Sequence, residues 1–328
     1  MAVARTFSDA GTAVARQLAL HKLRRGDIAF HWITFATALL VLVLLGSVAL
    51  SLMIGAWPAI KAYGPAFVTT ESWNPVTEKF GGLAPIYGTL VTSFIAMLIA
   101  VPVGLGIAVF LTETCPKNLR RPIGTAIELL AGIPSIIFGI WGLFVLAPVL
   151  QTTVQPALIA AFGNVPVLSS LFAGPPYGIG ILTASLILAI MVLPFITAVS
   201  RDVFSSVPPV LKEAAYGVGC TTWEVVRNIV IPYTRVGVIG GCMLGLGRAL
   251  GETMAVTFVI GNAHRISGSI LAPGTTISAT IANEFTEAVG DLHTSSLIAC
   301  GLILFLITFI VLSIARLMLM RLETKAGQ

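Results

Sequence analysis

The sequence predicts an all-α polytopic membrane protein with six transmembrane helices. Of its 328 residues, 56% are apolar and only 10% are charged, whereas soluble domains carry about 25% charged residues. Four stretches contain no Asp, Glu, Lys or Arg: 33–56, 80–112, 129–200 and 292–315. Each can supply the roughly 20 apolar residues with which a helix crosses a bilayer. Because these stretches are continuously apolar rather than alternating, they exclude a membrane β-barrel, intrinsic disorder and a disulfide scaffold.

The apolar stretches divide into six expected spans. The first begins at Ile33 and is too long for the core of a cleaved signal peptide, so we expect it to remain as a helix. An ordered external loop is expected at 57–85, and the uncharged loop 150–178 is expected to be interfacial or re-entrant. The six spans are predicted at 33–56, 86–112, 123–149, 179–200, 236–260 and 294–316.

The positions of Lys and Arg predict the orientation of these spans. An even number of spans places both termini on one side. On that side lie fifteen of the nineteen basic residues, in the N-terminal segment 1–32, the loop after the second span, the loop 201–235 and the C-terminal end with its tail 317–328. The other side carries only Lys61, Lys79 and Arg265. Since basic loops stay in the cytoplasm, we expect both termini there.

The sequence offers little for an enzyme. A Walker A loop needs a lysine directly after a glycine, and no lysine here follows one. There is no GxSxG, no HExxH and no paired His cluster, so we expect no catalytic residue, no metal site and no cofactor in this chain. The four cysteines are scattered and are expected to be reduced thiols: Cys115, Cys220, Cys242 and Cys300.

A charged pair inside the fifth span is the first candidate site. Arg248 lies near the middle of 236–260, where an Arg costs roughly 2.5–3.5 kcal/mol, and Glu252 follows four residues later. On a continuous helix the two side chains share one face with small residues. Two interpretations fit: an ion pair that locks helix packing, or a substrate pathway. The residues in this sector are Gly237, Gly240, Gly241, Gly245, Arg248, Gly251, Glu252 and Ala255.

The loop 201–235 is the second candidate site. Pro208 and Pro209 favour a helix start, and Gly219 favours a helix end, so the pattern predicts a short helix, a glycine stop and a second helix. From the residues alone, the interpretation to prefer for this loop is an amphipathic hairpin at the membrane interface.

The spacing within this loop resembles the EAA loop of ABC importer permeases. The matching residues are Glu213, Ala214, Ala215, Gly219, Ile229 and Pro232, with Ile231 at a position where Leu is commoner. Three further stretches, at 88–113, 131–144 and 247–262, resemble phosphate importers. GETMAV at 251–256 followed by IGN at 260–262 is similar to the PstC-like permease, whereas the sister PstA-like permease typically reads GETAP; the stretch 282–288 agrees.

This resemblance implies a type I importer permease (MetI-like) domain at 86–316 in a bacterial plasma (inner) membrane. It implies a sister PstA-like permease, two PstB-like ATPases that bind ATP and Mg on the cytoplasmic side, and an external PstS-like phosphate-binding protein. The EAA-type residues would then couple the ATPase to transport. In that family an Arg and a Glu of this span are required for function, and the matching positions are Arg248 and Glu252.

We therefore expect one half of the pathway of an ATP-driven phosphate importer that works by alternating access. Arg248, partly neutralised by Glu252, would offer phosphate one weak contact, and Ser135 and Thr253 could donate hydrogen bonds. One alternative is an importer permease for another oxyanion, sulfate or molybdate. Another is a secondary transporter or channel that works alone, and co-purification with an ATPase would distinguish it.

Overall fold

The computed structural model describes the backbone of residues 2–163, 165–166 and 168–326, and the side chains of residues 27–163, 165–166 and 168–321. The chain forms two compact units, Met1–Ile54 and Gly55–Gln328. Within the described part, six helices are long and apolar enough to cross a membrane, which confirms the predicted number. They are Asp27–Tyr63, Leu83–Thr114, Ser135–Phe162, Ile181–Ser205, Thr222–Leu250 and Asp291–Arg321.

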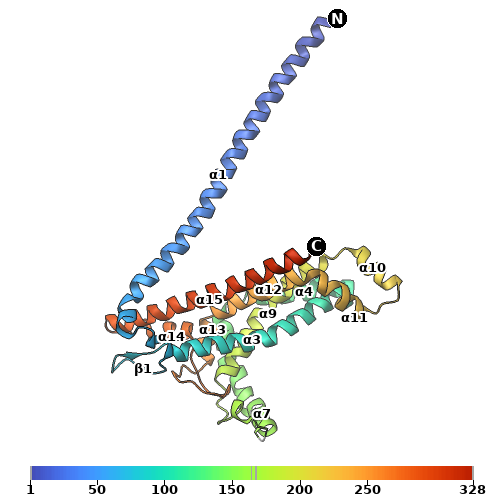
Figure 1. Cartoon of the computed structure of the whole chain (residues 1–328). Coiled ribbons are helices and arrows are strands. Elements are labelled where there is room, and N and C mark those ends of the chain that lie inside the picture. Colours follow the sequence, from blue (N-terminus) through green and yellow to red (C-terminus); the bar gives the residue numbers. More distant parts are fainter. Residues whose placement is uncertain (1, 164, 167, 327–328) are drawn as a thin grey trace. The chain divides into compact units, whose positions relative to one another are not determined.

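The first unit belongs to one long helix, α1 (Ala2–Tyr63), blue in Figure 1. This helix continues past residue 56, the predicted end of the first span. It contains Pro58. The basic side chains of the predicted N-terminal segment, Arg5, Arg16, Lys22, Arg24 and Arg25, lie outside the described side chains.

The centre of the second unit is built from three helices packed through small residues. These are α3 (Leu83–Val109), which continues as a π-helical turn η1 (Phe110–Thr114), α9 (Ile181–Ser205) and α12 (Ile231–Leu250). Gly104 of α3 meets Ile196 of α9, and Gly241 of α12 meets Val199 of α9. Lipid tails are as apolar as the side chains, so the hydrophobic effect does not drive membrane helices together. Close packing at small residues such as these stabilises their association instead. The long α15 (Asp291–Ala326) packs against α12.

The third span differs from the predicted range of 123–149, because that range joins parts of two helices. One helix, α4 (Lys117–Ala131), ends before residues 132–134, and α5 (Ser135–Trp141) begins after them. Pro134 disfavours a helical conformation for the residue before it and lacks an N–H, which explains the break. The helix then continues to Phe162 through η2 (Gly142–Leu146), α6 (Ala147–Val149), η3 (Leu150–Val154) and α7 (Gln155–Phe162).

The fifth span is also interrupted. It begins with α11 (Thr222–Val225) and the π-helical turn η4 (Val226–Val230), and it runs through α12 to Leu250. Residues 251–253 break the helix, and α13 (Met254–Val259) follows. The predicted single helix 236–260 is therefore wrong at Gly251, where glycine weakens the helix.

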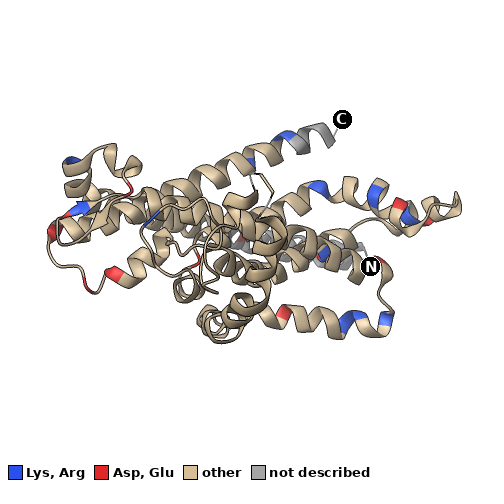
Figure 2. Cartoon of the chain, turned by 90° about the horizontal axis from the view of Figure 1, so that it is seen from below, with Lys and Arg blue, Asp and Glu red and all other residues tan. Residues whose placement is uncertain are grey.

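The remaining elements lie at the two ends of this bundle. One end carries α2 (Ala66–Thr69), α14 (Ile277–Glu284) and an antiparallel hairpin of β1 (Trp73–Asn74) and β2 (Lys79–Phe80). The other end carries α10 (Pro209–Gly217) and α11. A short α8 (Leu168–Leu171) lies in the loop after α7. In Figure 2 the charged residues gather at the ends of the bundle and are sparse along its middle, as expected for a chain that crosses a bilayer.

Candidate functional site

The loop between α9 and α12 has the predicted order of a short helix, a glycine stop and a second helix. Pro209 is the first residue of α10, and Gly219 ends the turn with a φ of +98°, a conformation that L side chains rarely adopt. The next helix, α11, is capped at Thr221: its hydroxyl accepts from the backbone N–H of Glu224, and the Glu224 carboxylate accepts from the backbone N–H of Thr221. Local sequence signals therefore shape this loop.

The outer surface of this loop is apolar and exposed, and we call it the loop patch. Val218 and Trp223 are 88% and 65% exposed, and none of the residues of α10 is buried. Apolar side chains that project from the end of the bundle are typical of a contact with another protein. The members of the loop patch are Val210, Leu211, Tyr216, Val218 and Trp223.

The predicted coupling residues divide between the two sides of this loop. Glu213 and Ala214 are exposed with the loop patch, and so are Gly219 and Pro232. Ala215 and Ile229 instead pack inward, against a buried cluster at the ends of α3, α9 and α12. The inward pair holds the loop to the bundle, while the exposed residues are free to meet a partner.

An ion pair between distant segments fixes α10 to the bundle. The Lys212 ammonium lies 2.6 Å from the Glu113 carboxylate at the end of α3, and only 6% of the Glu113 side chain is exposed. A second pair at this end, Arg201 with Glu128 at 2.7 Å, joins α9 to α4 and is more exposed. The sequence did not indicate Lys212 and Glu113 as a site, because 99 residues separate them.

Arg248 and Glu252 do not form the predicted ion pair. Among the described side chains, the partner of Arg248 is the Phe195 ring of α9, 4.5 Å from the guanidinium carbon. The break at Gly251 is the reason: the Glu252 N–H points to the Ala249 carbonyl, three residues back, so the face shared at a spacing of four is lost. Arg248 itself is exposed, and a cation–π contact of this kind contributes about 0.5–2 kcal/mol.

The stripe of small residues on α12 is not an open groove. Val203, Val199 and Val192 of α9 fill the space beside Gly237, Gly241 and Gly245 so closely that no side chain would fit there. The predicted groove is therefore wrong for Gly237, Gly241 and Gly245, which serve helix packing, whereas Gly240 has open space beside it. The buried Ala249 continues the packed row one turn later, and Arg248 next to it is exposed.

The two helix breaks lie on neighbouring helices. Gly139 of α5 contacts Ala255 and Phe258 of α13, and Gly142 lies against Val259. These contacts show that α5 and α13 run in the same direction from adjacent starts. Ser135 is the first residue of α5, and Glu252 and Thr253 directly precede α13. The Thr253 hydroxyl donates to the Gly251 carbonyl at 3.4 Å. Non-helical backbone at membrane depth is typical of a transport pathway.

A carboxylate at the opposite end of the bundle holds three segments together. Trp73 Nε1 of the hairpin donates to Glu284 at 2.7 Å, and His264 and His293 contact the same carboxylate at 2.9 and 3.0 Å. Trp73 stacks on His264, and Phe80 stacks on His293. We call these five residues the Glu284 cluster. Sequence reasoning missed it, because 211 residues separate Trp73 from Glu284.

The hydrogen bonds of this cluster favour the charged form of Glu284. Burial raises the pKa of the carboxyl group, but the hydrogen bonds from His264, Trp73 and His293 outweigh burial and hold the pKa below its ordinary value of 4.5. The cluster therefore contains a carboxylate at neutral pH, which accepts from all three rings. It connects the hairpin, the loop after α13 and the start of α15.

The described side chains contain no group of three or more His, Cys, Asp and Glu residues that could hold a metal ion. What the arrangement offers is an exposed cation beside broken membrane helices and an exposed apolar loop at one end. These features suit the passage of an anion and the docking of a partner.

Residues 100–324 match the model of the family described as "Binding-protein-dependent transport system inner membrane component". The chain is 69% identical to the "Phosphate transport system permease protein PstC" of Mesorhizobium japonicum, over 95% of this chain and 96% of that protein. It is 57% identical to the protein of the same name from Pasteurella multocida, over 92% and 94%.

Two solved structures show the same fold at low sequence identity. A bacterial alginate ABC transporter chain has a TM-score of 0.58 and 18% identity, and the likeness covers 88% of this chain and 94% of that chain. A chain of the inward-facing MetNI methionine ABC transporter has a TM-score of 0.55 and 16% identity, over 73% and 94%. The predicted MetI-like permease fold is thereby confirmed.

Proposed function

Because the chain belongs to the family of binding-protein-dependent transport system inner membrane components, we propose that it forms half of the pathway of an ATP-driven importer of inorganic phosphate. The observation that carries this proposal is the 69% identity, over nearly the whole chain, to a relative named as a phosphate permease. The exposed helix–glycine–helix loop is a structural observation that supports the proposal, since a permease needs a surface to which its ATPase can bind. We assign the permease domain to residues 86–316, as the sequence predicted.

The end of the bundle with α10 faces the cytoplasm in this proposal, and the Glu284 cluster faces outward. The loop patch, together with Glu213 and Ala214, docks on one subunit of a PstB-like ATPase dimer, which holds ATP and Mg. No lysine of this chain follows a glycine, so the chain itself has no Walker A loop for ATP. A PstA-like sister permease completes the pathway, and a PstS-like protein delivers phosphate from outside.

Transport in this proposal occurs by alternating access. ATP binding between the ATPase subunits moves the coupling loop, and the bundle rocks between inward-open and outward-open states. Arg248, exposed on α12 and without a carboxylate partner among the described residues, attracts the phosphate anion as it passes. Ser135 and Thr253, at the helix breaks, offer hydroxyl groups nearby. A single cation on an open face attracts an anion without trapping it, as transport requires.

Uptake by a strain that lacks only this gene tests the proposal. Phosphate, sulfate and molybdate uptake are measured side by side, with and without the gene restored, and the tagged chain is purified to identify bound ATPase. We expect only phosphate uptake to fall and to return. Loss of sulfate or molybdate uptake instead would indicate another oxyanion, and purification without an ATPase would favour a transporter that works alone.

A further inference from the structure

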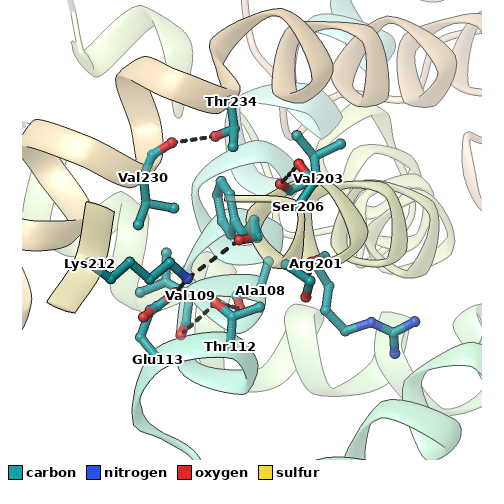
Figure 3. A network of polar contacts seen from close by, with 12 residues as sticks. Ala108, Val109, Thr112, Glu113, Arg201, Val203, Ser206, Lys212, Val230 and Thr234 are labelled. Atoms are coloured by element: carbon teal, nitrogen blue, oxygen red, sulfur yellow. Dashed lines mark hydrogen bonds and ion pairs between the residues drawn. The ribbon is translucent and has the colours of Figure 1, made fainter. Parts of the chain in front are cut away.

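We propose that Lys212 and Glu113 are positioning residues that transmit the movement of α10 to α3 and α9, and so to Arg248. This inference rests on the proposed function, because it concerns how an ATPase bound at the loop patch moves the pathway. Figure 3 shows Lys212 and Glu113 pointing toward one another from their two helices. Among the described side chains, three ion pairs lie at this end of the bundle: Lys212–Glu113, Arg201–Glu128 and Arg201–Asp202. Only the first of them reaches α10.

Helix α10 has few other attachments along its length. None of its residues is buried, and its outward face belongs to the loop patch. On its inward face Ala215 makes an apolar contact, which lets helices slide. The ion pair is different, because it is directional and short at 2.6 Å. A push on α10 therefore reaches α3 through Lys212, in addition to the chain connections of α10 with α9 and α11.

The burial of Glu113 makes the pair resist separation. Its side chain is 6% exposed and that of Lys212 is 18% exposed, so water has little access to the Glu113 carboxylate. Breaking such a pair leaves a buried charge uncompensated, which is strongly unfavourable. By contrast, the Glu128 side chain in the Arg201 pair is 48% exposed. The buried pair is thus the stiffer link.

The same ammonium also contacts α9. Lys212 Nζ lies 3.5 Å from the carbonyl oxygen of Phe204, in the last turn of that helix. The last carbonyls of a helix lack internal donors and carry partial negative charge, so a cation is favourable there. One side chain of α10 therefore joins the ends of both α3 and α9.

Helix α9 leads from this contact to the candidate pathway. Phe204 and Phe195 lie on the same helix, and Phe195 carries the guanidinium of Arg248 on its ring. Gly104 of α3 packs against Ile196 beside it, so α3 and α9 move together. A displacement of α10 can thus reach Arg248 through helix α9 and the contact between the Phe195 ring and the guanidinium.

The test uses the whole complex in lipid vesicles, with the ATPase, the sister permease and the phosphate-loaded binding protein. The measured quantities are ATPase co-purification, basal ATP hydrolysis, its stimulation by the loaded binding protein, and phosphate uptake. The main variant is the double change Lys212→Met with Glu113→Gln, which leaves no buried charge unpaired. We expect normal assembly and basal hydrolysis, with stimulation and uptake reduced at least tenfold.

The exchanged pair, Lys212→Glu with Glu113→Lys, should restore part of the stimulation, because it rebuilds the link with opposite polarity. The matched control is Arg201→Met with Glu128→Gln, which removes both ion pairs of Arg201, leaves only the exposed Asp202 without its partner, and should stay within twofold of wild type. Full stimulation in the Lys212–Glu113 double variant, or an equal loss in the control, would overturn the inference. A wild-type complex that moves no phosphate would contradict the proposed function instead, whatever the variants do.

If the double variant fails to assemble, Lys212→Arg tests whether the pair transmits movement or only stabilises the fold. This change keeps the charge and lengthens the link, so it should assemble and reduce stimulation without abolishing it. Assembly of Lys212→Arg with unchanged stimulation would show that the pair only stabilises the fold, and this too would overturn the inference.

Discussion

Arg248 shows how the surroundings of one residue change the expected result of a mutation. On a continuous helix, Arg248→Gln would leave Glu252 without its partner inside the membrane. In the structure the guanidinium instead lies on Phe195, and Glu252 sits in the helix break. Removing the charge of Arg248 therefore deprives no carboxylate of an ion-pair partner. An effect of the mutation on transport can then be measured separately from an effect on assembly.

For Arg248→Gln we expect normal membrane insertion and ATPase association, with phosphate uptake reduced at least tenfold, because the cation that attracts the anion is gone. Arg248→Lys keeps the charge but loses the planar donors, and it should retain part of the uptake. Uptake in whole cells and co-purification measure the two properties. The double change to Gln at Arg248 and Glu252 should behave like the single change. Near-normal uptake in either Gln variant would exclude the pathway role.

Glu284 predicts a pH dependence of stability at the opposite end of the bundle. Its pKa lies below the ordinary value of 4.5 in the folded protein, so its contribution is fully present above that value and is lost as the pH falls through the folded pKa. Glu284→Gln should lower the thermal midpoint of the purified protein at neutral pH, and the difference from the unchanged protein should shrink as the pH falls below about 4.5. A difference that grows as the pH falls below about 4.5 would contradict this sign.

At the scale of elements, the coupling loop depends on one backbone conformation. Gly219 has a φ of +98°, and nothing lies within 4 Å of the position that a side chain would take. Space is therefore not the constraint; the constraint is the left-handed backbone, which costs an L residue about 1–2 kcal/mol. Gly217, two residues earlier at the end of α10, has open space as well and an ordinary helical backbone.

This contrast supplies a matched pair of variants. Gly219→Ala should shift the loop away from its docking geometry and weaken ATPase association several-fold, with normal insertion of the chain. Gly217→Ala should leave association unchanged, since alanine suits a helix. Pull-down of the ATPase at increasing concentration measures the difference. Equal behaviour of the two variants would show that the turn at Gly219 does not determine docking.

At the scale of the whole molecule, the proposed orientation follows from which loops share an end of the bundle. The Lys212–Glu113 and Arg201–Glu128 pairs bring the loop after α3 and the loop after α9 to one end. The Glu284 cluster brings the hairpin and the loop after α13 to the other. Each end offers a very exposed valine, Val76 in the hairpin at 92% and Val218 beside α10 at 88%.

Cysteine substitution at these two positions tests the orientation. A thiol reagent that cannot cross membranes should label Val76→Cys in intact cells. It should label Val218→Cys only after the membrane is opened and the ATPase that covers the loop patch is removed. The unchanged chain, with its own four cysteines, gives the background. Labelling of Val218→Cys in intact cells would reverse the proposed topology.

The sequence by itself determined the number of spans and the order of helix, glycine stop and helix in the coupling loop. Long apolar runs form helices in a bilayer wherever they occur, because unpaired backbone groups are costly there. Likewise, Pro209, Gly219 and the Thr221 cap act on their immediate neighbours, so their effect can be read locally.

Only the tertiary structure decided what the charged residues contact. Hydropathy averages over a window and does not register the breaks at 132–134 and 251–253, so the sequence placed Glu252 on the face of Arg248. The contacts of Lys212 with Glu113 and of Trp73 with Glu284 join segments 99 and 211 residues apart. Such pairings depend on how the helices pack. Packing between small residues depends on the shapes of both helix surfaces, so the sequence of one segment does not determine it.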